Sequence, residues 1–350
     1  MKKFLLIVLL LLLLAVGGVV GLVMMSFNPA SYQKQVVESV QKLTGREVSI
    51  TGEASITWNP IPTIVMRDIR LSNTDKSENP VMLSVESAKI MIAWESLLKS
   101  PLVIKSVELT NPVLILERYE NNRSNFAFPF LLDPKFQLQE VDLLSEGSEA
   151  ATRINSIIVK NGTVKYVNRI TDSQVEVTGL SGELSVDTVR GPFRFKGTGN
   201  YLDKGYRASA DIGMFQGATP IDVKLNISEP TMAFSTDITG QFTPAGTDKL
   251  FEGAGTFSIG KINDFLAMIG LPAVDAKGGQ KTVGSVTLVS APAQDTLKDL
   301  TFQIGEGEQS IAVAGTFTRT ILGKKPTYSA NVGMSVFRYQ DWQADRKSVV

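Results

Sequence analysis

A strict alternation of polar and apolar residues between Glu47 and Trp58 is the clearest pattern in this chain. The odd-numbered positions are all polar, and the even-numbered positions are apolar apart from Gly52 at the centre. A period of two is typical of a β-strand with one wet face and one apolar face. The pattern therefore predicts one long strand over 47–58, with a bend or bulge at Gly52.

The same alternation recurs through the rest of the chain and predicts a mainly β protein. Val81–Val85 and Ala88–Trp94 alternate in opposite phase, which predicts a β-bulge near Glu86-Ser87. Farther along, Asn161-Gly162 separates two short apolar runs, and this dipeptide predicts a β-hairpin turn. In the second half of the chain, Ile262–Ile269 interrupts the strands with a helical pattern.

An uncharged run from Phe4 to Met25 follows the basic residues Lys2 and Lys3. As a helix it would reach roughly 33 Å, enough to cross the ~30 Å hydrocarbon layer of a membrane. We interpret this run as an uncleaved transmembrane helix; a signal peptide cut after Ala15-Val16-Gly17 is the alternative. Either route sends the rest of the chain across the membrane, with Lys2 and Lys3 on the cytoplasmic side.

A short amphipathic helix is predicted directly after this run. Asn28 suits the N-cap and Pro29 the first helical position, while Gly45 suits the position just past the end. Between them apolar residues recur at spacings of three and four, as on one face of a helix: Tyr32, Val36, Val40 and Leu43.

A shift in composition divides the rest of the chain in two. Between Asp133 and Glu149, 5 acidic residues face one basic residue, Lys135, which predicts an acidic linker at a domain boundary. We therefore expect, in order, a cytoplasmic tail, a transmembrane anchor, a first β domain, the linker and a second β-rich region: residues 1–3, 4–25, 26–130, 131–152 and 153–350.

Composition excludes several classes of function. The chain has 0 cysteines and 0 histidines, which excludes zinc sites of Cys and His, disulfides, lipoprotein acylation and Ser-His or Cys-His relays. It has 35 basic and 35 acidic residues, without the basic excess that a duplex-binding surface needs, so we expect no nucleic acid partner. The carboxylates show no metal-loop spacing, and we expect no metal, no cofactor and no enzymatic activity.

One short motif suggests chemistry. Ser96–Lys99 matches the S-x-x-K pattern of penicillin-recognising acyl enzymes, in which lysine can act as the base. Ser39–Lys42 matches it as well, and the companion S-D-N and K-T-G elements are missing. We interpret Ser96–Lys99 as a helical turn after a strand, and keep a Ser-Lys acyl hydrolase as a minor hypothesis.

A set of short motifs follows one another in a recognisable order: Phe27-Asn28-Pro29, Thr44-Gly45-Arg46, Leu71-Ser72-Asn73, Asn111-Pro112 and Asn125-Phe126. Their order and spacing resemble the AsmA family of Gram-negative envelope proteins, whose wider group includes TamB-like bridge proteins. The match is good over roughly the first third of the chain and diffuse thereafter. Asn125-Phe126 departs mildly from the Asn-Trp that the family usually has.

The resemblance implies a single-pass inner-membrane protein with a periplasmic body. Its first domain would be a curved antiparallel sheet, similar to the chorein-like start of bridge-type lipid-transfer proteins, with an apolar concave groove. The family is associated with phospholipid movement toward the outer membrane and with outer-membrane assembly, and it carries no known catalytic residues. Family members are commonly longer, so we expect the chain to be part of a longer protein.

The alternating apolar positions allow two interpretations, an open groove that holds lipid and an ordinary closed β core. Periodicity alone does not separate them, and the resemblance favours the groove. The candidate groove residues are Val48, Ile50, Ala54, Ile56, Trp58, Val85, Ile90, Val107 and Leu109. The function we expect is a holder or conduit for phospholipid acyl chains, and the alternative is a non-lipid scaffold that assists outer-membrane protein assembly.

Overall fold

The computed structural model describes residues 29–334 of the 350-residue chain, apart from short internal gaps at 59–60, 95–103, 120–122, 134–155, 171, 189, 218, 244–249, 269–270, 276–278, 292–293 and 323–324. The proposed anchor, residues 4–25, lies outside this part and stays a prediction, as does the linker beyond Asp133. Among the residues that are described, no helix combines the length and the apolar character needed to cross a membrane.

The described strands form one 17-stranded sheet, which confirms the prediction of a mainly β protein. They are β1 Val48–Ile50, β2 Ser55–Thr57, β3 Thr63–Ser72, β4 Val81–Ile92, β5 Ile104–Thr110, β6 Val113–Arg118, β7 Ser156–Asn168, β8 Ser173–Val186, β9 Phe193–Tyr201, β10 Lys204–Ile212, β11 Ile221–Glu229, β12 Phe234–Phe242, β13 Phe251–Ile259, β14 Thr282–Ala291, β15 Gln294–Ile304, β16 Ile311–Leu322 and β17 Lys325–Met334. The helices are α2 Pro29–Thr44, α3 Pro129–Leu132, α4 Ile262–Met268 and the 3-10 turn η3 Gly307–Gln309.

Strand order follows chain order. β1 and β2 both pair with β3, β5 and β6 both lie between β4 and β7, and from β7 onward each strand pairs with the next. The pairing is antiparallel as expected, except that β7 runs parallel to β5 and β6. The sheet therefore continues without a break from the predicted first β domain into the second.

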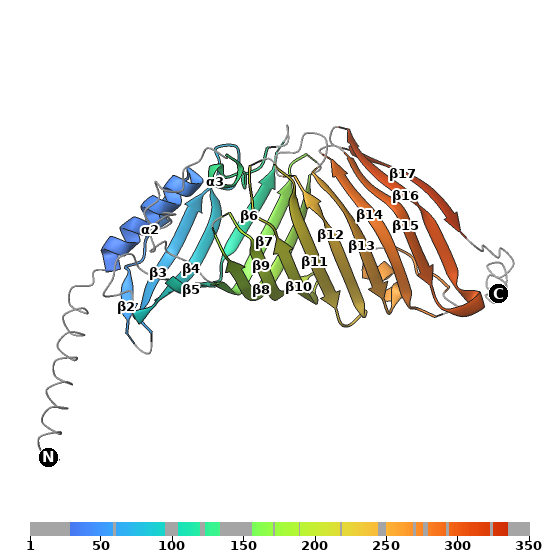
Figure 1. Ribbon diagram of the computed structural model, residues 1–350, viewed down its shortest axis with the longest axis horizontal. Helices are drawn as coiled ribbons and strands as arrows, with labels where there is room; N and C mark the ends of the chain where they lie inside the picture. Colours follow the sequence, from blue (N-terminus) through green and yellow to red (C-terminus); the bar gives the residue numbers. More distant parts are fainter. Residues whose placement is uncertain are drawn as a thin grey trace, which may run out of the picture.

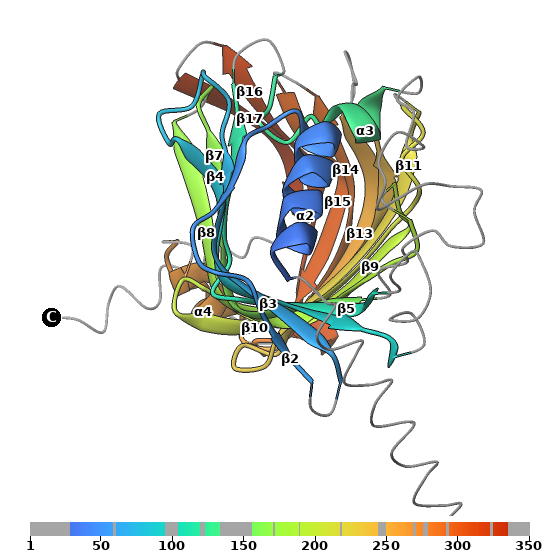
Figure 2. The same ribbon diagram turned by 90° about the vertical axis from the view of Figure 1, so that its left-hand side faces the viewer.

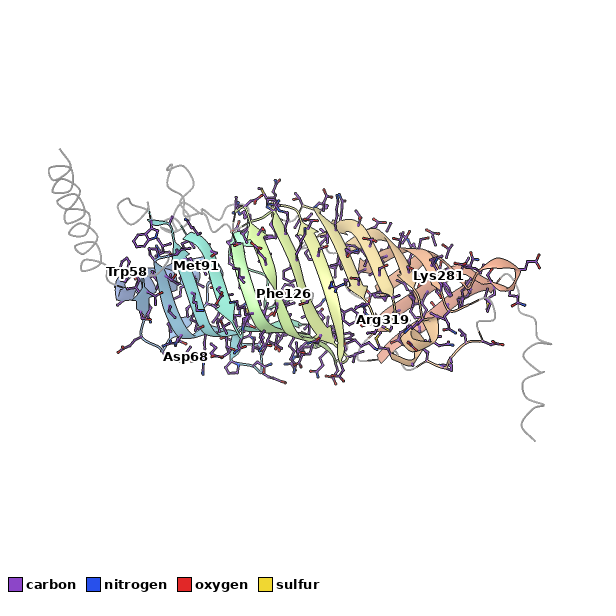
Figure 3. The ribbon with its side chains drawn as sticks, turned by 90° about the horizontal axis from the view of Figure 1, so that it is seen from below. Trp58, Asp68, Met91, Phe126, Lys281 and Arg319 are labelled. Atoms are coloured by element: carbon purple, nitrogen blue, oxygen red, sulfur yellow. The ribbon has the colours of Figure 1, made fainter. Side chains whose placement is uncertain are left out.

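The sheet is curved along its length into a trough, with the strands crossing from rim to rim (Figure 1). Seen along the trough, the sheet forms the floor and both walls, and α2 lies inside at the N-terminal end (Figure 2). Val36 of α2 packs against a core cluster that includes Ile64 and Ile90, so the face that carries these residues is the concave one. Trp58 lies toward the α2 end, and Lys281 and Arg319 lie toward the other end (Figure 3).

Both predicted helices are present in the described residues. α2 begins at Pro29 and ends at Thr44, and Gly45 follows with a φ of +67° and its amide donating to the Gln41 carbonyl at 2.8 Å. A left-handed residue that closes the last turn is what a glycine C′ position supplies. α4 at Ile262–Met268 confirms the helical interruption.

The predicted long strand over 47–58 is two short strands, β1 and β2, separated at Gly52. A Cβ built on Gly52 would lie 2.8 Å from the Arg67 Cβ, so the close approach to β3 requires a glycine. The bend is confirmed, and so is the alternation, because every polar residue of this segment is exposed and every apolar one is half-buried.

A row of bulge-like positions crosses the first half of the sheet, and we call it the crease: Asp68, Glu86, Asn111 and Asn161. Asp68, Asn111 and Asn161 have positive φ values of 53°, 48° and 54°. Asn111 donates a side-chain hydrogen bond to Glu86 and accepts one from Asn161 at 2.7 Å, so these positions lie side by side.

The crease explains one prediction that holds only in part, the β-bulge near Glu86-Ser87, and one that is wrong. The phase change around Glu86 is real, since Val85 and Ala88 are both buried, yet β3 and β4 keep their register there because Asp68 bends at the facing position. The prediction of a hairpin turn at Asn161-Gly162 is wrong, because both residues lie within one strand, β7. Asn161 adopts the left-handed conformation typical of a hairpin turn, but uses it to bend one strand in step with its neighbours.

Candidate functional site

One line of side chains runs along the concave face, each member directly opposite the next in the sheet register. We call it the apolar row: Ile56, Ile64, Ile90, Val107, Ile157, Leu184, Phe195, Ala210, Leu225, Ile238, Gly255 and Val286. It crosses the sheet from β2 to β14, and every member is apolar or glycine. Because partners in register share a face, the concave surface is apolar along this whole line.

The opposite face has the opposite character. Moving one residue along each strand gives a second line in register: Thr57, Thr63, Met91, Ser106, Ser156, Ser185, Arg194, Asp211, Lys224, Thr239, Ala254 and Thr287. All but Met91 and Ala254 are polar, and from Arg194 to Ala254 all are exposed. The sheet thus separates a wet convex face from an apolar concave face, as one-sided alternation requires.

The crease preserves this separation through the first half of the sheet. Each strand there changes phase as it crosses the line, so the concave face passes from Met66 to Ile69 on β3 and from Ala88 to Val85 on β4. Without these phase changes, bending the strands would place polar side chains in the trough. The crease therefore bends the wall while the lining stays apolar.

Burial along the apolar row falls from the α2 end to the open trough. Ile64 and Ile90 are 2% and 8% exposed because α2 covers them. From Ile157 to Ile238 the row is half-buried, and neither core cluster of the described residues includes a member of the row there. The walls shield these side chains from water only in part, so this stretch is an open apolar surface inside a trough.

All nine candidate residues from the sequence lie on the concave face. Four of them, Ile50, Ala54, Ile90 and Val107, belong to or pack against the core cluster at the α2 end. Val85 is buried, and the remaining four are half-buried: Val48, Ile56, Trp58 and Leu109. Contact of these residues with lipid stays a prediction. The candidate list does not include the open stretch from Ile157 onward, although the strands there show the same alternation.

A second helix covers part of the concave face farther along. Ile262 of α4 forms a core cluster with Ile259 and Ile304, at the ends of β13 and β15. Phe265 of the same helix stacks on Phe234 with ring centroids 5.8 Å apart. α4 thus covers the concave face near one end of β12, β13 and β15. Ile238 and Val286, in the middle of their strands, remain half-buried.

A buried polar cluster stabilises the convex side of the first half. Glu117 is 0% exposed, and its carboxylate accepts hydrogen bonds from Arg169 at 2.6 Å, Tyr119 at 2.8 Å and Asn73 at 3.2 Å. Its amide donates to the Asn125 side chain at 2.8 Å. A buried carboxylate with this many donors is satisfied, which makes the cluster a structural connection between the loops that contain it.

Burial alone would raise the pKa of Glu117, but hydrogen bonds from Ser77, Arg169 and Tyr119 outweigh it and hold this pKa below its ordinary value. Glu117 is therefore ionised at neutral pH. In the described residues no group of acidic side chains is arranged to hold a metal ion.

Three of the motifs behind the family resemblance meet at this cluster, namely those that contain Arg46, Ser72-Asn73 and Asn125. Arg46 donates to the Asn125 carbonyl and to Ser72 and Asn73, and its guanidinium lies 5.3 Å from the centre of the Phe128 ring. These motifs are visible in the sequence, but the contacts between them are not. Their separation along the chain, up to 79 residues, hides the contact.

Comparison with known families gives one match. A model of the AsmA family matches residues 1–245 of the chain. The protein belongs to the AsmA family. The matched AsmA region includes the polar cluster, the crease and the trough as far as β12. No curated protein matches the chain.

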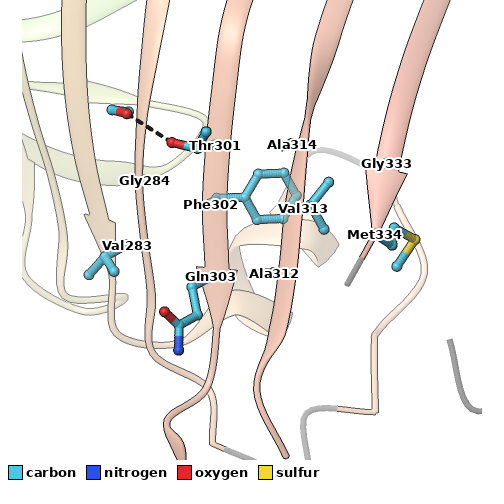
Figure 4. Close-up of a pocket in the computed structure, with 11 residues that line it drawn as sticks. Val283, Gly284, Thr301, Phe302, Gln303, Ala312, Val313, Ala314, Gly333 and Met334 are labelled. Carbon is cyan, nitrogen blue, oxygen red and sulfur yellow. Dashed lines mark hydrogen bonds between the residues drawn. The ribbon is translucent and has the colours of Figure 1, made fainter. Parts of the chain in front are cut away.

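A shallow hollow of about 750 Å³ crosses the last four strands of this AsmA protein (Figure 4). Phe302 lines it together with its neighbours on β15, Thr301 and Gln303, and Val313 lines it from β16. The Thr301 hydroxyl is hydrogen-bonded to that of Ser285 at 2.9 Å. The hollow lies over β14–β17, and no member of the apolar row lines it.

Of the two S-x-x-K matches, only Ser39–Lys42 lies in the described residues. Ser39 is buried on α2 and Lys42 is exposed, so the described match lies on an ordinary amphipathic helix. Ser96–Lys99 lies outside the described residues.

Proposed function

We propose that this AsmA-family protein holds or conducts phospholipid acyl chains along the concave face of its sheet, and that it contributes in this way to outer-membrane lipid homeostasis. The observation that supports this most is the half-buried stretch of the apolar row from Ile157 to Ile238, which runs through β7–β12 without a charged residue. No chemistry is needed, and the protein acts as a binding surface rather than an enzyme.

Acyl chains would bind because they leave water. Each buried CH₂ contributes about 0.8 kcal/mol, so a chain lying along several strands gains many times RT. The convex residues next to the row, such as Arg194 and Asp211, keep the outer surface hydrated. Head groups would remain in solvent at the mouth of the trough, so the surface selects for acyl chains rather than for a particular head group.

Photo-crosslinking tests the proposal directly. A crosslinking residue at Leu225 should capture phospholipid in cells, whereas one at the neighbouring Lys224, on the convex face of the same strand, should not. Ile56 and Thr57 form the same pair at the other end of the row. Absence of lipid at every concave position, with intact protein, would show that this surface is not a lipid site.

The proposal includes a place in the cell, with the chain anchored in the inner membrane and its body in the periplasm. It is supported by Lys2 and Lys3 before the uncharged run from Phe4 to Met25. A periplasm-active reporter fused after Val350 should be active, and the protein should resist carbonate extraction. A reporter active only in the cytoplasm would refute this topology, and release by carbonate would favour a cleaved signal.

A second candidate function is a scaffold for outer-membrane protein assembly. β17 favours it, because among the described strands it pairs only with β16 and exposes Tyr328, Val332 and Met334. An unpaired edge can add a strand from another chain. Purified protein without bound lipid, together with crosslinks from β17 to an outer-membrane protein, would support the scaffold over the conduit.

A further inference from the structure

Two pairs of strands in the open trough repeat one arrangement of phenylalanine and glycine. In β9, Phe195 precedes Gly197 by two residues, and Gly197 faces Gly182 of β8. In β13, Phe251 precedes Gly253 by two residues, and Gly253 faces Gly240 of β12 in the same way. All six residues lie on the concave face, because each is a member of the apolar row or lies two or four residues from one on the same strand.

The phenyl rings lie over the glycine pairs. A Cβ built on Gly197 would lie 2.6 Å from the Phe195 Cζ, and one built on Gly182 would lie 3.0 Å from the Phe195 Cε2. For Phe251 Cζ the corresponding distances are 2.8 Å from Gly253 and 2.7 Å from Gly240. Each ring therefore occupies the space that a side chain at either glycine would fill.

The rings can lie flat on the sheet because the residues beneath them are glycines. Because glycine has no Cβ, an aromatic ring can lie against the backbone and cover the exposed peptide groups, as in aromatic rescue of strand glycines. With any larger residue beneath it, the ring would have to rotate away from the sheet and into the trough. A third ring, Phe257, covers Gly284 of β14 in a similar way, but it packs against the core cluster that includes Ile262 of α4.

We propose that Phe195 and Phe251 form a flat aromatic floor that contacts acyl chains directly. The glycines beneath them let the rings lie flat, so that the rings do not narrow the trough. This inference rests on the proposed lipid function and adds to it the residues that touch the chains. The glycines act through the rings and are positioning residues. Since the floor offers ring faces and no charged group, it suits straight hydrocarbon rather than head groups.

A photo-crosslinking residue at each ring position tests the contact with lipid. Benzoylphenylalanine placed at Phe195 or at Phe251 in the full-length protein should capture phospholipid in cells. The matched controls are Lys196 and Glu252, the next residues on the convex face, where capture should be at least tenfold lower. Capture at these convex sites equal to that at the rings would overturn the proposal.

Leu225, on β11 between the two ring sites, separates failure of this inference from failure of the function. If Leu225 captures lipid but neither ring position does, the aromatic floor is wrong while the trough still binds lipid. If no concave position captures lipid, the proposed function itself fails.

A polarity change separates a lipid-contacting floor from an ordinary core. Phe251→Asp should lower lipid capture at Leu225 at least tenfold, whereas Phe251→Leu, which stays apolar, should change it less than twofold. Ala254→Asp, on the convex face of the same strand, is the matched control and should leave capture unchanged. The thermal unfolding curve of Phe251→Asp should stay cooperative, and its collapse would mean that the ring is core rather than floor.

Discussion

The two halves of the trough use the same alternation of residues for different purposes. At the N-terminal end, α2 lies on the concave face, and the apolar row beneath it is core, with Ile64 and Ile90 almost fully buried. From β7 onward the row continues in register with the same kinds of side chain, but from Ile157 to Ile238 it is only half-buried. A covering helix, and not the strand pattern, therefore decides whether an apolar face becomes core or an open surface.

The two halves also differ in how they are held. The first depends on long-range polar contacts, with Glu117 bonded to Asn73 and Arg169 from distant segments, and on the crease through Asp68 and Asn161. The later strands form a plain antiparallel meander in which each strand pairs with the next. We infer that the first half fixes the shape of the trough and the second half extends it.

An aspartate placed on the apolar row in each half should give the largest difference in stability between core and open surface. Ile90→Asp buries an unpaired charge beneath α2 and should cost about 4 kcal/mol of unfolding free energy. Leu225→Asp, on the same face, should cost about 1 kcal/mol or less because the charge can reach water in the trough. Urea denaturation measures both unfolding free energies. Equal losses of stability in the two variants would mean that the two stretches of the apolar row are equally buried.

Removing the central charge of the polar cluster should give the next largest effect. Glu117→Gln leaves Arg169 without its buried partner, a change that should cost about 3 kcal/mol. Glu176→Gln, at an exposed position of β8, should change stability by less than about 0.5 kcal/mol. A loss at Glu117 no greater than that at Glu176 would show that the cluster does not stabilise the first half.

Local features of the fold were predictable because each depends on neighbours in the chain. The Gly45 cap, the bend at Gly52 and the alternation over 47–58 follow from propensity and period. Asn161-Gly162 failed because the same left-handed conformation serves a hairpin or a bulge, and only the neighbouring strands select between them.

The candidate site was only partly predictable for a similar reason. The apolar face of β1–β5 could be read from the sequence, but not that α2 would fill that end of the trough. The Glu117–Arg169 contact joins residues 52 positions apart, so no local pattern reveals it. The phenylalanine–glycine floor was also hidden, although its Phe-x-Gly spacing in β9 and β13 is visible once the register pairs Gly182 with Gly197.

A single methyl group should distinguish the tightly packed floor from an ordinary strand position. Gly240→Ala places a Cβ against the Phe251 ring and the Gly253 backbone and should cost about 2 kcal/mol. Gly205→Ala, on the convex face of β10, meets only the Asn200 side chain at 3.6 Å and should be neutral or stabilising by about 0.5 kcal/mol. Thermal unfolding of the two variants checks this, and equal shifts would mean that the glycine pair is not tightly covered.

The smallest expected effect is a dependence of stability on pH that originates in the first half. The pKa of Glu117 is held below the value of about 4.3 that it has in the unfolded chain. A lowered pKa in the folded state adds stability that is fully present above the unfolded value and is lost as the pH falls through the folded one. The unfolding free energy should therefore be steady from pH 7 to pH 5 and fall below about pH 4.

Glu117→Gln isolates this contribution from those of other carboxylates, because Glu108 and Glu229 also have lowered pKa values and remain in both proteins. The variant should be less stable than the parent at pH 7, and the gap should narrow as the pH falls, since protonation removes from the parent the charge that the variant already lacks. Urea denaturation at pH 7, 5 and 3.5 measures the gap. A gap that stays constant over this range would mean that the ionised carboxylate of Glu117 contributes nothing beyond its shape, and that the first half is held by packing, as the second half is.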